Sequence, residues 1–230
     1  MGTVAENLSA VKERIAKAAA RVGRDPETIT LVAVSKTMPV DRIREAIAAG
    51  QRVFGENRVQ EAQAKVHALG REVRWHLIGP LQRNKVKVVC DLFDLVESVH
   101  GLPLAQEINA RASQHGIIMP ILIQVHIGDE TTKSGVAAAD ALALVQQVAL
   151  LSHVSVRGLM CVPPPVDIPD HARLYFAQLR TLAARIAREQ IPTVSMTELS
   201  MGMSHDFEVA IEEGATMVRV GSAIFGPRPA

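Results

Sequence analysis

Short apolar runs alternate with helix-forming segments along the chain, and this alternation is what most restricts the fold. The first run, residues 31–34, carries no polar side chain and leads within two residues to a lysine. A strand that is apolar on both faces is typical of a parallel sheet covered by helices. Eight such runs, each followed by a helical segment or the start of one, predict an α/β fold: a single (β/α)8 TIM-type barrel with an extra N-terminal helix. The runs are centred near residues 31, 53, 75, 94, 122, 157, 196 and 218.

The competing architecture is a doubly wound sheet, which usually has fewer strands and a G-x-G-x-x-G turn. No such turn occurs in the sequence, and no linker divides it, so we expect residues 1–230 to form one barrel domain. The first helix has an apolar stripe that includes Leu8 and Ile15. We expect it to be capped by Asn7 or Ser9 and to serve as a lid on the barrel.

Composition narrows the functional classes. Hydrophobic residues make up 48% of the chain, and the net charge is +1. This charge gives no electrostatic footprint for nucleic acid or for an acidic membrane surface. Cys90 and Cys161 lie in apolar surroundings and are expected to be small buried thiols of a reducing compartment. Residues 1–7 lack the features of a secretory signal, and no apolar run reaches membrane-spanning length, so we expect a soluble, cytoplasmic protein.

Lys36 is the first candidate for chemistry. It follows the first buried strand, and in α/β barrels the carboxyl ends of the strands carry the active site. Burial favours the neutral form of a lysine amine, which is then a nucleophile.

Two glycine- and serine-containing segments at the last two strands predict a phosphate site. Residues 200–204 are expected to end the seventh strand and open a helix, and residues 221–222 follow the eighth. Backbone N–H groups and helix N-termini at these positions often bind phosphate in barrels. Glycines that only form turns are the alternative.

Other polar residues at strand ends admit two interpretations. Arg219, within an apolar strand, either pairs with Glu198 or Glu56 or donates to a ligand. Asn57 is either a helix cap or a polar contact at the second strand end. His76, between apolar neighbours, is expected to be a packed, hydrogen-bonded core residue. No metal-ligand spacing and no Ser-His-Asp order is evident.

An amine at the first strand and a phosphate site at the last two would suit a phosphorylated aldehyde. Pyridoxal phosphate is one such ligand, held by a lysine imine and by phosphate-binding loops. A sugar phosphate in a Schiff-base aldolase is the other, although aldolases usually carry the lysine on a later strand.

Several motifs resemble those of the pyridoxal phosphate homeostasis protein (YggS/PROSC) family, and the resemblance spans about residues 31–226. The segments that carry it are VAVSKT at 32–37, FGEN at 54–57, WHLIGPLQ at 75–82, KSG at 133–135, RGLM at 157–160, LSMGMS at 199–204 and VRVG at 218–221.

The resemblance implies a barrel like the N-terminal domain of alanine racemase, with pyridoxal 5'-phosphate bound to Lys36 as a Schiff base. Arg219 would face the pyridine nitrogen, and Asn57 would lie beside the cofactor. The implied phosphate contacts are Ser200, Met203, Ser204, Gly221 and Ser222.

The sequence departs from the family pattern at three positions. His126 stands where asparagine is common, Arg58 where an aromatic residue is common, and His205 where an acid is common. Alanine racemase also draws a catalytic tyrosine from a second domain. The one tyrosine here, Tyr175, is expected on a helix away from the strand ends.

The resemblance therefore implies a cofactor-binding protein of vitamin B6 homeostasis that buffers or delivers pyridoxal phosphate, without a clear catalytic reaction. Apo-enzymes that use the cofactor are the implied partners, and we expect a monomer. A residual racemase or amino-acid lyase is the alternative.

Overall fold

The computed structural model describes residues 2–128 and 134–227, and its strands form a closed parallel barrel. The barrel strands pair in the order β4-β3-β2-β1-β9-β8-β7-β5, and pairing of β4 with β5 closes the ring. The predicted (β/α)8 barrel is thus confirmed. A short additional strand, β6, pairs with the end of β5. The strands are β1 (Thr30–Val34), β2 (Val53–Glu56), β3 (Arg74–Leu77), β4 (Leu95–Val99), β5 (Met119–His126), β6 (Val136–Ala137), β7 (Val154–Met160), β8 (Val194–Met203) and β9 (Met217–Val220).

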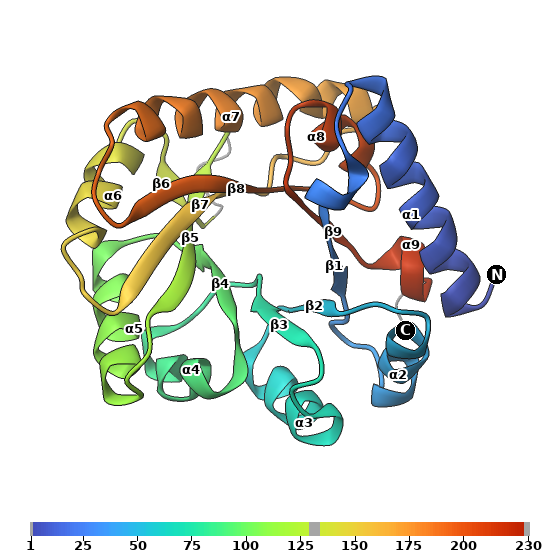
Figure 1. Ribbon diagram of the computed structural model, residues 1–230, viewed down its shortest axis with the longest axis horizontal. Coiled ribbons are helices and arrows are strands. Elements are labelled where there is room, and N and C mark those ends of the chain that lie inside the picture. The colour runs from blue at the N-terminus through green and yellow to red at the C-terminus, as the bar shows by residue number, and fades with distance from the viewer. Residues whose placement is uncertain (1, 129–133, 228–230) are drawn as a thin grey trace.

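Helices surround the ring of strands, as Figure 1 shows. Three of the connecting segments begin or consist of 3-10 turns rather than α-helix. The α-helices are α1 (Val4–Arg21), α2 (Val40–Ala48), α3 (Val59–Leu69), α4 (Val89–Leu92), α5 (Leu102–Gln114), α6 (Ala141–Val148), α7 (Arg173–Arg188), α8 (Phe207–Glu212) and α9 (Ser222–Phe225); the 3-10 turns are η1 (Pro26–Thr28), η2 (Arg83–Val88) and η3 (Pro169–Ala172).

From the sequence, the seventh strand is expected to span residues 193–199, and this predicted end is wrong. The strand β8 continues to Met203 instead of ending at Leu199, so residues 200–203 are strand rather than loop. The register between β8 and β9 shifts between Ser200 and Met203, and Gly202 adopts a φ of +88° there. The glycine therefore marks an irregularity within the strand, as isolated glycines in strands often do.

The N-terminal helix is confirmed, but its predicted cap and its role as a lid are wrong. Thr3 caps it through a capping box with Glu6, so the helix begins before Asn7. It packs against α8, α9 and α2 in the outer ring (Figure 1). The helix that follows β9, α9, has only four residues and covers little of the barrel on that side. The buried apolar residues of α1 cover the rest.

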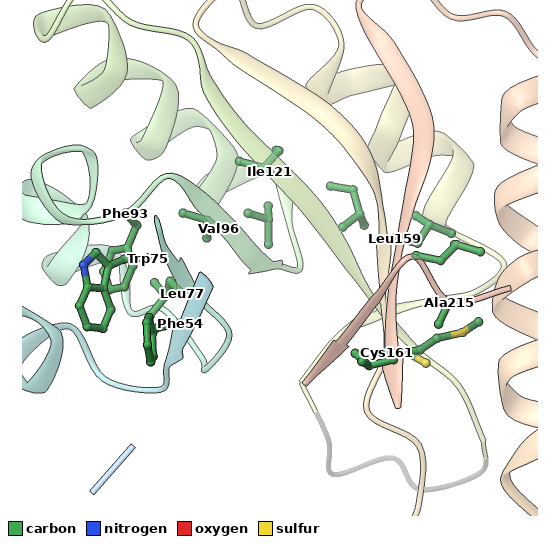
Figure 2. Packing of buried hydrophobic residues seen from close by; sticks show 14 of the residues in the cluster. Phe54, Trp75, Leu77, Phe93, Val96, Ile121, Leu159, Cys161 and Ala215 are labelled. Carbon is green, nitrogen blue, oxygen red and sulfur yellow. The ribbon is translucent and has the colours of Figure 1, made fainter. Parts of the chain in front are cut away.

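Alternation along the strands separates two apolar layers. Val32 belongs to the cluster inside the barrel, whereas Leu31 and Ala33 pack outward against the helices. Figure 2 shows part of the outer layer, where the Phe54 and Trp75 ring centroids lie 5.5 Å apart. The inner cluster consists of Val32, Val53, Leu95, Leu122, Met160 and Met217.

Both cysteines are buried free thiols, as expected from the sequence. Burial raises the pKa of the Cys161 thiol to about 12, so this side chain is an apolar core group rather than a nucleophile.

An ionic network joins α1 to α8. Arg14 Nε donates to Glu208 Oε1 at 2.6 Å, and Arg21 Nη2 donates to Glu208 Oε2 at 2.9 Å. The Arg14 guanidinium also lies 4.5 Å from the centre of the Phe207 ring. Partial burial acts to raise the pKa of Glu208, but the hydrogen bonds from Arg14 and Arg21 outweigh it and the pKa falls below its usual value.

Replacing Glu208 by glutamine should lower the free energy of unfolding by up to about 1 kcal/mol at neutral pH, since partly exposed pairs are screened by solvent. A lowered native-state pKa means that the contribution is complete above the usual glutamate range and is lost as pH falls through the native value. Urea unfolding of both proteins should therefore differ at pH 7 and converge in acid. The control is Glu13→Gln, which breaks the exposed pair with Lys17 and should change nothing measurable. Equal stability of the Glu208 variant and the parent at pH 7 would contradict the role of the network.

Candidate functional site at the carboxyl ends of the strands

A cavity of about 520 Å³ opens at the carboxyl ends of the barrel strands, within the size range of small-molecule sites. Seven of the eight predicted site residues line it, and they come from four separate strand ends. These are Lys36, Asn57, Met203, Ser204, Arg219, Gly221 and Ser222.

Ser200 is the predicted site residue that does not line the cavity. Its side chain is fully buried beneath the site, where its Oγ accepts a hydrogen bond from Arg219 Nη1 at 2.6 Å. The same hydroxyl donates to Glu97 Oε2 at 2.5 Å. The structure thus places Ser200 behind Arg219 rather than at the cavity wall.

The strand period directs Lys36 to the cavity. Val32 lies inside the barrel, Val34 lines the cavity, and Lys36 follows two residues further on the same side. Burial of all five residues from Leu31 to Ser35 keeps this part of the chain in one register.

The cavity combines apolar walls with positive charge. Val34, Ile78 and Phe225 contribute apolar surface, while Lys36 and Arg219 contribute cationic groups. Among the described residues that line it, none is an aspartate or glutamate. Such a cavity suits an anionic ligand with an apolar body.

The two predicted phosphate-binding segments contact each other. The N–H of Gly221 and the N–H of Ala223 both donate to Ser204 Oγ, at 3.2 and 3.4 Å. Three polar groups of the two loops therefore converge at one edge of the cavity. The Met203 N–H, also predicted as a phosphate donor, donates to Asp206 Oδ1 at 2.6 Å.

Asn57 is not a helix cap, because Arg58 occupies the N-cap position of α3. The backbone of Asn57 lies so close to Gly79 that a Cβ on that glycine would be 2.3 Å from the Asn57 carbonyl oxygen. A residue without a side chain at position 79 thus allows the second and third strand ends to approach each other.

Arg219 is held by neutral oxygens rather than by the predicted carboxylates. Its Nη2 donates to the Cys161 carbonyl at 2.7 Å, in addition to the bond to Ser200. Neither suggested acid bonds to it: Glu198 accepts from Thr216, and Glu56 accepts from Ser35 and Lys65.

Glu97 lies at the centre of the polar layer below the cavity. Its Oε1 is 2.8 Å from His76 Nδ1, which confirms that His76 is a packed, hydrogen-bonded core residue. Full burial acts to raise the pKa of Glu97, but the bond to His76 and the charge of Arg219 bring it below the usual value. Four strands contribute to this layer, since His76, Glu97, Ser200 and Arg219 belong to β3, β4, β8 and β9.

Three further residues that the sequence analysis singled out lie at the edge of the cavity, away from it or outside the described part of the chain. His126 does not line the cavity, and its Nε2 lies 2.9 Å from the Gly128 carbonyl. His205 is exposed and lines the cavity. Lys133 lies outside the described residues.

The expectation that Tyr175 lies away from the strand ends is wrong. The tyrosine lies on α7, but its Cε1 would be 3.3 Å from a Cβ built on Gly128, just beyond β5. It is nevertheless not among the residues that line the cavity.

Sequence reasoning missed several residues of the site. Gln124, Ser134 and Phe225 line the cavity, and Glu97 bonds to Ser200 and His76 beneath it. Gln124 had a usable signal, because it is a polar residue in an otherwise apolar run near a strand end. No group of three or more His, Cys, Asp or Glu side chains within residues 2–128 and 134–227 is placed to bind a metal.

Replacing Glu97 by alanine should lower the free energy of unfolding by about 3 kcal/mol at neutral pH, because His76, Ser200 and Arg219 would lose a buried carboxylate partner. Since the native-state pKa is lowered, the parent loses this advantage as pH falls through that value. Urea unfolding measures the difference, with Glu72→Ala at an exposed site as the control. Equal stability of the two variants would show that the buried carboxylate is dispensable.

Comparisons with known proteins agree with this architecture. Residues 7–229 match the model of the alanine racemase N-terminal domain. The chain is 46% identical over 224 residues to the pyridoxal phosphate homeostasis protein of Aquifex aeolicus, covering 97% of each chain.

Two solved structures are similar to this fold. PipY of Synechococcus elongatus, determined with pyridoxal phosphate bound, is 39% identical with a TM-score of 0.84, covering 97% of this chain and 100% of PipY. An alanine racemase from Clostridium difficile has a TM-score of 0.76 at 14% identity, covering 99% of this chain but 60% of the racemase, and shows the shared fold alone. The chain therefore belongs to the pyridoxal phosphate homeostasis protein family, on the barrel fold of the alanine racemase N-terminal domain.

Proposed function

We propose that the protein binds pyridoxal 5'-phosphate as a Schiff base on Lys36 and acts in vitamin B6 homeostasis by buffering or delivering the cofactor. One observation carries this proposal: Lys36 lines the same cavity as the two loops that contact each other through Ser204, Gly221 and Ala223. The relative PipY, solved with pyridoxal phosphate bound, supports the choice of ligand.

The residues present fit the cofactor by chemical class. Lys36 supplies an amine for the aldehyde, and the apolar walls at Val34 and Ile78 suit the face of a pyridine ring. Ser204 and Ser222 offer hydroxyl donors at the cavity edge that suit a phosphate, and the Gly221 N–H holds the Ser204 hydroxyl in place.

Arg219 is the candidate partner of the pyridine nitrogen. A guanidinium keeps its proton at any physiological pH, so it would leave that nitrogen unprotonated. Bound pyridoxal phosphate supplies an electron sink for carbanions, and an arginine partner makes that sink weaker than an aspartate would. A weaker electron sink makes amino-acid chemistry less favourable, which supports a binding role over a catalytic one.

Residual racemase or lyase activity is the second candidate, and the likeness to alanine racemases that suggests it is a likeness of fold. Holo-protein incubated with L- and D-alanine in deuterium oxide should show no exchange at Cα by proton NMR. Exchange above a protein-free solution of pyridoxal phosphate would replace the proposal of a binding protein with that of an enzyme.

The proposal extends to partners and location. We propose a cytoplasmic monomer that passes pyridoxal phosphate to apo-enzymes and does not act on nucleic acid or membranes. The net charge of +1 supports the last point. No helix in residues 2–128 and 134–227 has the length and apolarity to cross a membrane.

Replacing Lys36 by alanine should abolish the visible absorbance band that pyridoxal phosphate acquires on the parent protein. The reason is that the imine requires a primary amine at the cavity. Absorbance spectra after removal of unbound cofactor measure the loss, and Lys12→Ala on α1 provides a lysine control. A parent protein that acquires no band would refute the proposed function, and a Lys36 variant that keeps the band would refute the assigned lysine.

Replacing Ser204 by alanine should weaken retention of pyridoxal phosphate on the order of tenfold, because the variant loses a hydroxyl that joins the two loops and is placed to meet a phosphate. Pyridoxal, which lacks the phosphate, should bind the parent and the variant equally. Equilibrium titration with both compounds measures the difference, with Ser113→Ala on the exposed side of α5 as the control. An equal loss for pyridoxal and its phosphate would contradict the assignment.

A further inference from the structure

A buried lysine lies directly behind the strand end that carries Lys36. Lys65, on α3, is 5% exposed, although lysines are almost never buried unless paired. Its Nζ donates to Glu61 Oε1 at 2.6 Å, to Glu56 Oε1 at 2.8 Å and to the Ser35 carbonyl at 2.6 Å. The three donors of the ammonium group thus have three acceptors, two of them carboxylates.

The same cluster binds the chain on both sides of Lys36. On the N-terminal side, the Ser35 carbonyl accepts from Lys65, and Ser35 Oγ donates to Glu56 Oε1 at 2.6 Å. On the C-terminal side, the N–H of Thr37 donates to Glu61 Oε1 at 2.5 Å. Glu61 Oε1 therefore serves both Lys65 and the residue after Lys36.

The backbone held on the C-terminal side is strained. Thr37 has a φ of +64°, in the left-handed region that a β-branched residue rarely adopts. Such conformations persist where the surroundings determine them, and they gather at functional sites. The hydrogen bond from Thr37 to Glu61 is a specific interaction that holds it there.

Stability alone does not account for the cluster. Buried ion pairs often gain little over apolar side chains of the same volume, because both charges lose their hydration. Glu56 is fully buried, and its Oε2 has no hydrogen-bond partner among the described residues. Burial raises the pKa of Glu56 even though the charge of Lys65 acts to lower it. The carboxylate therefore loses more free energy by leaving water than its partner restores.

We infer that Glu61 and Lys65 are positioning residues for Lys36: they hold the backbone of residues 35–37 so that the Lys36 side chain reaches the cavity in the geometry that captures an aldehyde. The inference rests on the proposed function, since pyridoxal phosphate is the aldehyde. Neither residue lines the cavity, so both act through Lys36.

The test compares rates at which apo-protein captures pyridoxal phosphate, followed by the rise of the visible band after mixing. Glu61→Ala should slow capture on the order of tenfold, because Thr37 can relax from the left-handed region and carry Lys36 with it. Glu61→Gln should stay within about twofold of the parent, since its amide oxygen can still accept from Thr37 and Lys65.

Rescue distinguishes positioning from a general loss of stability. Glycine adopts positive φ readily, so Thr37→Gly should restore at least about half of the rate lost in Glu61→Ala, on a logarithmic scale. A variant that is slow because it is unstable would gain nothing from the added glycine. Thermal melting of each variant verifies that it is folded at the assay temperature.

The chain offers a matched control. Glu13 and Lys17 form the same i,i+4 pair on α1 at 2.7 Å, but both are exposed and neither lines the cavity. Glu13→Ala and Lys17→Met should capture the cofactor at the parent rate, whereas Lys65→Met should be slow. Should Glu61→Ala fail to fold, Glu61→Asp replaces it, because the shorter acid keeps the charge and withdraws the acceptor from Thr37.

The outcomes separate the two proposals. A parent protein that captures no pyridoxal phosphate refutes the proposed function. A parent that captures it, with Glu61→Ala or its Asp replacement equally fast, refutes the positioning role. Slow capture without rescue by Thr37→Gly also refutes it, since backbone geometry would not be the cause.

Discussion

Closure of a parallel barrel is the constraint on which the rest of the structure depends. Since all eight barrel strands run in one direction, every strand delivers its last residues to the same end. The two-residue period then sorts the side chains along β1, with Val32 and Lys36 inside and Ser35 toward the helices. A single short segment thereby presents an amine to the cavity and its own backbone to a supporting cluster.

Two buried polar networks flank this end of the barrel, and each supports a cationic side chain at the cavity. Inside the barrel, His76, Glu97 and Ser200 lie behind Arg219. Outside it, Glu56, Glu61 and Lys65 hold the backbone around Lys36. Burying such groups costs hydration free energy, so a chain built for stability alone would favour apolar residues at these places. These networks hold Lys36 and Arg219 at defined positions, and this role accounts for the loss of hydration free energy.

Local patterns predicted most of the architecture. The eight apolar runs are the barrel strands, because burial on both faces of a strand is visible in short windows of sequence. Seven predicted site residues line one cavity for the same reason: strand ends of a parallel barrel must meet. The continuation of β8 through Gly202 was not predictable from local pattern, since a glycine is as typical of a turn as of a strand irregularity.

The two polar networks could not be predicted from the sequence, for a different reason. Ser200 and Glu97 are separated by 103 residues, and their hydrogen bond depends on the packing of strands on opposite sides of the ring. In sequence, Glu61 and Lys65 have the i,i+4 spacing of an ordinary surface pair, like Glu13 and Lys17. The fold buries Lys65, whereas Glu13 and Lys17 both stay exposed. Patterns of spacing do not distinguish such cases, because burial is set by what packs against the helix.

The central claim, that the cavity holds an aldehyde cofactor on the lysine after β1, is tested most directly by borohydride reduction of the protein loaded with pyridoxal phosphate, followed by peptide mass spectrometry. Reduction makes the bond between the lysine and the ligand permanent, so ligand and attachment site are identified together. The account predicts one phosphopyridoxyl group, located on Lys36. An adduct on other lysines with Lys36 unmodified would contradict it.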